Sequence, residues 1–359
     1  MKAAVLYEAK KPLKIEEFQL DEPGPGEVLV RLIASGVCHS DWHVVKGEWP
    51  MIKLPCILGH EGAGIVEQLG PNVNSVKKGD HVILSWKPAC GTCEACESGW
   101  PNLCDRWLKP TSRPRNQAGT PVDQMSFLGT FAEYTVVPEA AAVSIPKDVP
   151  FAQASLVGCG VMTGVGAALN TARVQPGATV AVFGCGGVGL NCIQGARIAG
   201  ATTIIAVDLL DNKLDLGREF GATHTVNASR ENPVDRIRAL TDGKGAHYAF
   251  EAIGLVEAPF VQSVHCTRRK GVTVWVGHAP VNTRVTLDAR DLLLEKSIVA
   301  SFYGSARPHV DFPRLLTLYK AKKLMLDELV SERMPLSDVN KAFDLLGKGS
   351  VARSVLDCQ

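Results

Sequence analysis

Four closely spaced cysteines are the most chemically informative residues of the chain. They fall in the run CGTCEACESGWPNLC, whose C-x2-C-x2-C-x7-C spacing comprises Cys90, Cys93, Cys96 and Cys104. This spacing can bring four thiolates around one tetrahedral Zn²⁺, and a site filled by four protein ligands leaves no position for substrate. A disulfide cluster or unligated core cysteines are the alternatives, but no secretory segment is recognised that would support oxidation. The run therefore predicts a structural zinc site, and catalysis must be sought elsewhere.

Three further residues, Cys38, His60 and Cys159, have the side-chain types of a catalytic zinc site. Two thiolates and one imidazole leave a fourth coordination position open for water or substrate. The three lie far apart in the sequence, so only folding can bring them together and spacing alone does not identify them. Each also has a structural interpretation. Cys159 fits a small core residue between glycines, and His60 fits a hydrogen-bonded histidine in a glycine-rich turn.

A G-x-G-x-x-G run predicts a dinucleotide site. It follows the apolar run TVAVF, precedes a helix-like segment, and consists of Gly184, Cys185, Gly186, Gly187, Val188 and Gly189. The glycines allow a tight turn and a close approach of backbone to a pyrophosphate, whose charge is favoured by the helix N-terminus. Asp208 ends the next apolar run, where a carboxylate binds the adenosine ribose and repels a 2′-phosphate. We therefore expect NAD rather than NADP; the alternative is a glycine-rich turn without a ligand.

The pattern of apolar residues changes near residue 161. Before it, short β-rich runs are separated by Gly, Pro and Asp turns: AAVLY, EVLVRLIAS, GAGIVEQLG, HVILSW and FAEYTVV. After it, the runs TVAVFG, TIIAVD, YAFEAIG and TVWVG alternate with helix-length segments, which is typical of βαβ units and a parallel sheet. Beyond residue 298, two helical segments and a short strand, ARSVLD, are expected to return to the first domain. The predicted fold class is α/β, with a mostly-β domain and a doubly wound parallel-sheet domain.

The composition is that of a soluble globular protein. The 359 residues include 46% hydrophobic residues, enough for a sizeable core in two domains. With 38 Lys and Arg against 37 Asp and Glu, the net charge of +1 lacks the basic excess typical of nucleic-acid binding. Neither a signal-peptide core nor an uninterrupted membrane-length apolar run is recognised. We expect a cytoplasmic protein without nucleic-acid or membrane partners, whose eleven cysteines include metal ligands.

These motifs resemble the zinc-containing medium-chain alcohol dehydrogenase family over essentially the whole chain. Three segments carry the resemblance: residues 59–73 (GHEGAGIVEQLGPNV) with the family's zinc signature, residues 78–82 (KGDHV) with its companion turn, and residues 90–104 with its structural-zinc lobe. The resemblance implies that Cys38, His60 and Cys159 bind a catalytic zinc. It also implies that Glu61 and Asp41 stand behind this zinc, orienting the ligands or approaching the metal themselves. Two zinc ions per chain are expected.

The resemblance further implies a GroES-like catalytic domain, residues 1–160 and 301–359, and a Rossmann domain, residues 161–300. Ser40 and His43 match the family's proton relay, in which a hydroxyl, the cofactor ribose and a surface imidazole export the proton of the alcohol while hydride passes to the nicotinamide. Other residues match positions beside NAD: His39, Thr163, Lys213, Gly277, His278 and Arg353. His39 stands where family members often carry arginine, and a partly charged histidine should hold the pyrophosphate less tightly.

The resemblance places four aromatic side chains along or near the substrate channel: Trp42, Trp49, Trp86 and Phe127. Burial in the domain core is the alternative for any of these tryptophans, and for Trp42 it is equally favoured. An apolar, aromatic wall favours bulky, aromatic or medium-chain primary alcohols, which would be oxidised reversibly to aldehydes. The segment 105–126 is about as long as the corresponding loop of dimeric family members, so a homodimer joined through edge strands of the Rossmann domains is expected.

Two other functions fit the sequence. One is a thiol-adduct formaldehyde dehydrogenase acting on S-hydroxymethyl glutathione or a mycothiol-type adduct, because residues 301–305 (SFYGS) and the C-terminal region resemble those relatives. Against the glutathione version, that class carries an acidic pair where residues 47–51 (GEWPM) contain one carboxylate. The other is a non-catalytic NAD-binding or lens-type structural protein. Such relatives tend to lose zinc ligands, and all of them are present here.

Overall fold

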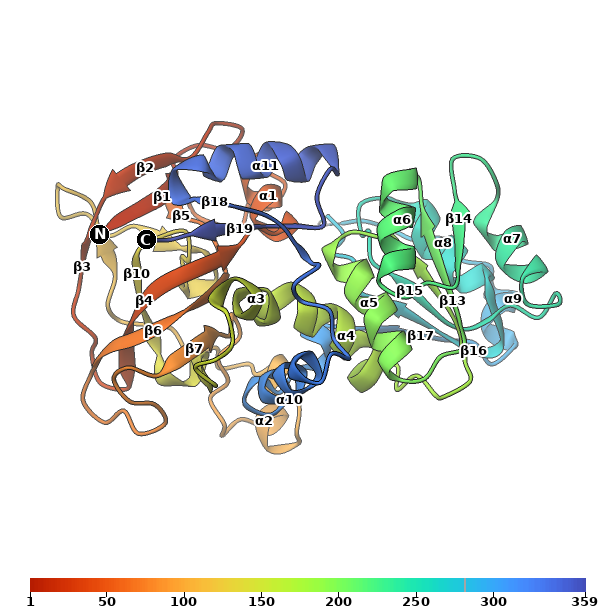
Figure 1. Cartoon of the computed structure of the whole chain (residues 1–359), viewed down its shortest axis with the longest axis horizontal. Helices are drawn as coiled ribbons and strands as arrows, with labels where there is room; N and C mark the ends of the chain where they lie inside the picture. The colour runs from red at the N-terminus through yellow and green to blue at the C-terminus, as the bar shows by residue number, and fades with distance from the viewer. Residues whose placement is uncertain (281) are drawn as a thin grey trace. The chain divides into compact units, whose positions relative to one another are not determined.

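The chain folds into two compact units. The computed structural model describes residues 1–280 and 282–359. Unit 1 consists of Met1–Cys159, Arg307–Lys320 and Leu326–Gln359, and unit 2 of Gly160–Ala306 and Ala321–Met325 (Figure 1). Unit 1 is therefore built from residues on both sides of unit 2 in the sequence.

Unit 1 is mostly β. Its main sheet has the order β11-β7-β6-β4-β19-β18, and β10 also pairs with β4. The strands of this sheet are β4 (Glu27–Gly36), β6 (Glu61–Leu69), β7 (His81–Leu84), β10 (Tyr134–Pro138), β11 (Ala142–Ile145), β18 (Val330–Pro335) and β19 (Arg353–Asp357). A second sheet has the order β2-β1-β5-β9, made of β1 (Lys2–Leu6), β2 (Lys14–Glu17), β5 (Cys56–Ile57) and β9 (Asp123–Gln124). Strands β3 (Gln19–Leu20) and β8 (Pro114–Arg115) form a separate pair.

Strand β4 organises the main sheet because it pairs along both edges. Val28, Val30 and Leu32 alternate with partly exposed residues and are fully buried, as expected for one face of a strand turned to the core. At its carboxyl end, Gly36 pairs with Glu61 of β6 on one side and with Val355 of β19 on the other. Residues more than 300 positions apart in the sequence thus meet where β4 ends.

The helices of unit 1 cover the sheets and connect them. They are α1 (His39–Lys46), α2 (Glu94–Glu97), α3 (Phe151–Leu156), α10 (Pro308–Lys320) and α11 (Val339–Lys348). In α11, Val339, Ala342, Phe343 and Leu346 are buried at the i, i+3, i+4 and i+7 spacing of an amphipathic helix. They join a core cluster with residues of β1 and α1.

Unit 2 contains one sheet of six parallel strands in the order β14-β13-β12-β15-β16-β17. The strands are β12 (Thr179–Phe183), β13 (Thr203–Asp208), β14 (His224–Asn227), β15 (Ala246–Glu251), β16 (Thr267–Trp275) and β17 (Ser297–Ala300). In chain order this is the 3-2-1-4-5-6 arrangement of a doubly wound fold, which binds ligands where the order reverses, between β12 and β15. The predicted α/β fold class is confirmed.

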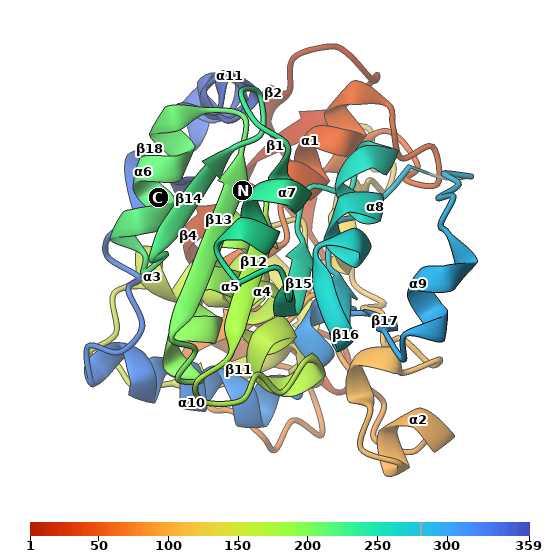
Figure 2. The same ribbon diagram turned by 90° about the vertical axis from the view of Figure 1, so that its right-hand side faces the viewer.

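The helices of unit 2 pack on both sides of this sheet (Figure 2). They are α4 (Met162–Gly166), α5 (Gly187–Ile198), α6 (Asp211–Glu219), α7 (Pro233–Ala239), α8 (Glu257–His265) and α9 (Ala289–Leu293). Helix α5 contacts β12, α6 contacts β13 and β14, and α8 contacts β15 and β16. Helices α5 to α9 each lie between two successive strands of the sheet.

One helical stretch, Phe151–Thr171, is interrupted by two π-helical turns, Val157–Val161 and Ala167–Thr171. Such turns are rare and are found frequently at functional sites. The first of them contains Cys159. The stretch is long and apolar enough to cross a membrane, but 83% of its apolar window is buried inside the protein, as in the core helix of a soluble protein.

Helix α1 was not predicted from the sequence. Its residues, HSDWHVVK, show no clean apolar period, because Asp41 and His43 are buried together with Val44 and Val45. The polar residues that obscure the pattern are those assigned to the site.

Candidate active site and metal centres

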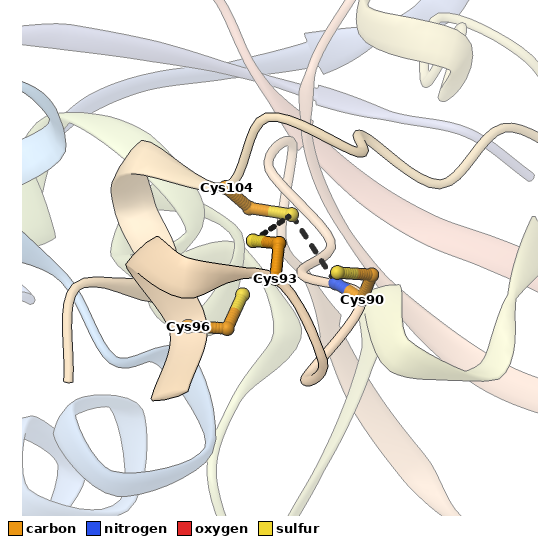
Figure 3. A group of neighbouring side chains, drawn as sticks. All are labelled: Cys90, Cys93, Cys96 and Cys104. Carbon is orange, nitrogen blue, oxygen red and sulfur yellow. Dashed lines mark hydrogen bonds between the residues drawn. The ribbon is translucent and has the colours of Figure 1, made fainter. Parts of the chain in front are cut away.

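The lobe of residues 90–104 brings its four cysteines together (Figure 3). Their Sγ atoms all lie within 4.8 Å of one another. Cys93 precedes the first residue of α2, and Gly91 and Gly99 turn the chain at φ angles of 76° and 86°, which glycine adopts without steric penalty. Every cysteine of the chain is a free thiol, so the structure contains none of the disulfides considered as an alternative.

The donor set of this lobe fits Zn²⁺. Cys93 Sγ and Cys104 Sγ are 3.8 Å apart, and the backbone N–H of Cys90 donates to Cys104 Sγ at 3.3 Å. The backbone N–H of Thr92 lowers the pKa of Cys90 to about 6, whereas burial raises the pKa of Cys96 to about 12 and also raises that of Cys104, so metal binding must displace protons from these two thiols. Four thiolates at this separation repel one another unless a cation neutralises them.

A second donor cluster lies at the carboxyl end of β4. Donor atoms of Cys38, His60, Glu61 and Cys159 lie within 4.8 Å of one another, and all four residues are buried. Cys38 caps the N-terminus of α1, His60 and Glu61 start β6, and Cys159 comes from the π-helical turn after α3. The structure thus brings together the three residues predicted as catalytic-zinc ligands, with a carboxylate as a fourth donor.

Asp41 holds this cluster from behind. Its Oδ1 accepts the backbone N–H of Gly59 at 2.9 Å and lies 3.3 Å from His60 Nδ1, while its Oδ2 accepts the N–H of Cys38 at 3.3 Å. With Nδ1 facing the carboxylate, His60 Nε2 points the other way. Among residues 1–280 and 282–359, this buried Nε2 has no hydrogen-bond partner. A buried, unpaired imidazole nitrogen beside two cysteine sulfurs fits a metal ligand oriented by a carboxylate.

The charges of the cluster are strongly linked. The hydrogen bond with the Cys159 thiol lowers the pKa of Cys38 well below its usual range, and the same bond raises that of Cys159 well above it. Burial by itself lowers the pKa of His60, but Asp41 and Cys38 outweigh burial and leave this pKa well above its usual value. Zn²⁺ requires thiolates and a neutral imidazole, so metal binding at this cluster is coupled to the release of protons.

Arg353 is buried, whereas a residue that binds the pyrophosphate is expected to be exposed. Its guanidinium is 4% exposed, contacts the Glu61 carboxylate through Nη2, and donates from the same nitrogen to the carbonyl of Val37 at 3.1 Å. Burial raises the pKa of Glu61 to about 7, while the charge of Arg353 opposes this rise. β19 places Arg353 here, because it pairs with the end of β4. A contact of Arg353 with the cofactor stays a prediction.

The two relay residues lie on α1, and one of them corrects the sequence analysis. Ser40 Oγ is 3.7 Å from Cys38 Sγ, beside the donor cluster. His43 is not a surface imidazole: it is 8% exposed, because Trp49 stacks on its ring with centroids 5.4 Å apart. His43 Nδ1 lies 2.5 Å from Glu48 Oε2. Sequence analysis gave Glu48 no role, although a carboxylate five residues after a histidine, just past a helix end, was an available signal.

The glycine-rich run forms the turn between β12 and α5 in unit 2. A Cβ on Gly189 would lie 1.7 Å from the Gly184 carbonyl oxygen, and Gly184 itself has a φ of 92°, so both positions require glycine. A Cβ on Gly186 would meet nothing within 4 Å, which leaves space for a ligand at the N-terminus of α5. Asp208 Oδ2 accepts the backbone N–H of Cys185 at 2.8 Å. The turn and the acidic residue therefore fit a dinucleotide.

A second pair of turns lies at the same edge of this sheet. Gly254 follows β15 and Gly277 follows β16, and a Cβ on Gly277 would lie 2.4 Å from the Gly254 nitrogen. Buried Glu251, which sequence analysis missed, accepts the backbone N–H groups of Ile253 and Gly254 at 2.8 and 2.9 Å. His278 follows Gly277 directly. The remaining predicted cofactor residues lie on helices: His39 at the start of α1, Thr163 in α4 and Lys213 in α6.

The predicted aromatic wall is divided between two places in unit 1. Trp42 stacks on Phe343 of α11 with centroids 5.4 Å apart, within a core cluster. Trp86 and Phe127 instead each make an edge-on contact with Trp107, at 6.4 and 5.2 Å between centroids. Trp86 follows β7, whose residue Ile83 pairs with Ala63 of β6 just beyond the donor cluster. Trp107 was not predicted, since nothing in its local sequence distinguishes it.

Comparison with known proteins agrees with this geometry. The family model described as the alcohol dehydrogenase GroES-like domain matches residues 24–147, and that of the zinc-binding dehydrogenase matches residues 187–321. The chain is 40% identical to S-(hydroxymethyl)glutathione dehydrogenase of Paracoccus denitrificans, over 99% of both chains. It is 39% identical to alcohol dehydrogenase class-3 of Dictyostelium discoideum, over 99% of this chain and 97% of the relative.

A solved structure is also similar to this chain over its whole length. Benzyl alcohol dehydrogenase from Acinetobacter calcoaceticus superimposes with a TM-score of 0.93 and 33% identity, over 100% of this chain and 99% of that one. Both domains of the fold are therefore shared with alcohol dehydrogenases. Because these matches span the whole chain and coincide with the two zinc donor sets and the dinucleotide turn, the chain belongs to the zinc-containing medium-chain alcohol dehydrogenase family, whose members oxidise CH–OH groups with zinc and a nicotinamide cofactor.

Proposed function

We propose that the protein is a zinc-dependent dehydrogenase that oxidises the S-hydroxymethyl adduct of formaldehyde and a low-molecular-weight thiol, with NAD as hydride acceptor. The observation that carries the reaction is the convergence of Cys38, His60 and Cys159 around an unpaired His60 Nε2. The reaction R–S–CH2–OH to R–S–CHO removes one hydride and one proton. It is the oxidation of a primary alcohol in which the carbon also bears sulfur.

The residues of unit 1 have separate tasks in this reaction. Cys38, His60 and Cys159 would hold the zinc, and Asp41 keeps His60 in one tautomer. Bound there, Zn²⁺ supplies a Lewis acid that lowers the pKa of the alcohol, and the cofactor supplies the hydride acceptor. Ser40 would accept the hydroxyl proton at the start of the relay, since its Oγ is 3.7 Å from Cys38 Sγ, and His43 would carry the proton outward.

Sequence similarity favours the thiol-adduct substrate over the free bulky alcohols expected first. The relatives named S-(hydroxymethyl)glutathione dehydrogenase and class-3 alcohol dehydrogenase are 40% and 39% identical to the chain. Glutathione is less well supported as the thiol of this adduct. The single carboxylate of residues 47–51, Glu48, already contacts His43 and lies 3.8 Å from Lys46 Nζ. We therefore propose a thiol other than glutathione, such as one of the mycothiol type.

Bulky primary alcohols are the second candidate substrates. Two observations favour them: the similarity to benzyl alcohol dehydrogenase, and the aromatic cluster of Trp86, Trp107 and Phe127 beyond β7. Aromatic side chains offer stacking area to an aromatic substrate. A preference of about tenfold over ethanol needs only about 1.4 kcal/mol of differential binding in the transition state.

A substrate panel followed at the NADH absorbance band separates the two candidates. The thiol-adduct proposal requires that formaldehyde be oxidised only when a thiol is supplied, with glutathione less effective than another thiol. Efficient oxidation of benzyl or cinnamyl alcohol without any thiol, at least about tenfold above ethanol, would instead support the second candidate. In that case Trp86→Ala should remove most of the preference and leave the zinc content unchanged.

We also propose NAD rather than NADP as the cofactor, a homodimer as the assembly and the cytoplasm as the location. The first is supported by the Asp208 carboxylate beside the glycine-rich turn. The second rests on the length of the segment 105–126, and the third on the free cysteine thiols, which fit a reducing compartment.

A further inference from the structure

His43, the relay histidine, contacts the partly exposed carboxylate of Glu48. The side chain of His43 is 10% exposed, with Trp49 stacked on one face at an interplanar angle of 21°. Its Nδ1 lies 2.5 Å from Glu48 Oε2, and the Glu48 side chain is 36% exposed. A proton that enters this ring at Nε2 can therefore leave from Nδ1 onto a carboxylate that is in contact with solvent.

The end of α1 places Glu48 over His43. The helix stops at Gly47, whose φ of 75° reverses the chain, and the backbone N–H of Glu48 donates to the His43 carbonyl oxygen at 2.9 Å. A larger residue at position 47 would be strained by this φ, and its Cβ would approach that of Ala9 to 3.0 Å. The position of the carboxylate is thus fixed by the backbone and not by its side chain alone.

The charges around Glu48 keep it ionised and able to accept. The hydrogen bond with His43 lowers the pKa of Glu48, and the positive charge of nearby Lys46 lowers it further, with a smaller contribution from His39. Lys46 Nζ is 3.8 Å from Glu48 Oε1. All three basic groups lie on α1.

We propose that Glu48 is the outlet of the proton relay. His43 accepts the proton of the alcohol at Nε2, gives up its other proton from Nδ1 to Glu48 Oε2, and Glu48 releases that proton to water. Glu48 acts through His43 as a positioning residue: before turnover it accepts the hydrogen on Nδ1, and proton exchange with water restores this tautomer after each turnover. The inference rests on the alcohol oxidation proposed above, but not on which alcohol is oxidised.

Glu48→Gln tests the proposal, because it removes the proton acceptor at position 48 but keeps the hydrogen bond that orients the His43 ring. The amide oxygen of glutamine can still accept the Nδ1 hydrogen bond, so the ring keeps its place, but an amide is not a base. The burst of NADH formation in stopped-flow experiments should slow by about tenfold in this variant. A small diffusible base such as imidazole should restore the burst rate. Zinc content and melting temperature should equal those of the wild type.

Two controls isolate the effect. Glu332→Gln removes an exposed carboxylate of β18 and should leave the burst unchanged. In a His43→Gln background, Glu48→Gln should cause no further slowing, since the two residues act in series. An unchanged burst rate in Glu48→Gln, or a slower burst that added base does not restore, would show that Glu48 is not the outlet of the proton relay. The wild type is first assayed with each substrate, so a wrong substrate assignment appears as a lack of wild-type activity. The Glu48 proposal is judged separately, from the ratio of the burst rates of variant and wild type.

Discussion

Asp41 shows how one side chain can set the chemistry of its neighbours. Its carboxylate is fully buried, and it binds the backbone of Cys38 and of Gly59 as well as facing His60. Because these partners flank two of the metal donors, the carboxylate fixes their separation before any metal binds. The same residue determines which imidazole nitrogen of His60 is available to the metal.

Cys159→Ala should remove catalysis without unfolding the protein. The substitution leaves two of the three predicted protein ligands, and even partners behind zinc ligands are commonly worth about 10- to 100-fold. We expect activity to fall by more than about a hundredfold and the zinc content to fall from two per chain to one. Metal analysis and circular dichroism check both parts. Wild-type protein prepared without chelator that contains one zinc or none would contradict the assignment of two sites.

Asp208 should determine the choice between NAD and NADP. Asp208→Ala should weaken NAD binding by about tenfold, because hydrogen bonds to a charged group contribute about 1.5–3 kcal/mol, and it should improve the relative use of NADP. Asp208→Asn is the matched variant: it can still accept the N–H of Cys185 but no longer repels a phosphate. NADH fluorescence titration and the ratio of kcat/KM for the two cofactors measure these effects. A wild type that prefers NADP would refute the assignment.

Among the elements, the π-helical turn Val157–Val161 and the lobe of residues 90–104 support the two metal sites differently. The turn is part of a long buried helical stretch, so Cys159 is held by packing. The lobe has only a four-residue helix, α2, with no buried residue, and a short 3₁₀ turn. With little apolar packing of its own, the lobe is expected to depend on a bound zinc for its structure.

Cys93→Ala should therefore destabilise the lobe. We expect the melting temperature to fall by several degrees, as a loss of about 2 kcal/mol implies for a chain of this size, and proteolysis to begin within residues 90–104. Calorimetry and mass spectrometry of the early fragments provide the measurement. Retention of two zinc ions with unchanged stability would show that the lobe holds no structural metal.

The sequence predicted elements whose apolar period is regular and missed those whose buried residues are polar. β4 and β6 were found as β-rich runs and β12 and β13 as short continuous apolar runs, and each of the four ends at or just before a glycine or an aspartate. Helix α1 was missed because its buried face includes Asp41 and His43. The cluster of Cys38, His60 and Cys159 was reached by resemblance alone, since no local pattern connects residues so far apart. The contact of Glu48 depends on where α1 ends, and that of Arg353 on the distant strand β19. Neither contact produces a periodic pattern in the sequence.

The whole molecule should be a dimer in solution. Strand β17 is the edge of the parallel sheet in unit 2, and an unpaired edge presents backbone groups to a second chain. The nearby helix α9 carries exposed Leu292 and Leu293, as expected of a surface that another subunit covers. Light scattering should report twice the mass of 38.4 kDa. A tetramer or a monomer would contradict this prediction.

The discontinuity of unit 1 has a consequence for biosynthesis. Arg353, the partner of Glu61, and Val355, which pairs with Gly36 at the end of β4, are both translated after every residue of unit 2. On the ribosome, unit 2 can fold while β4 still lacks β19 on one edge and Glu61 lacks its counter-charge. We expect chains that end before residue 353 to be more sensitive to proteases than the full chain, although their metal-binding cysteines have all been made.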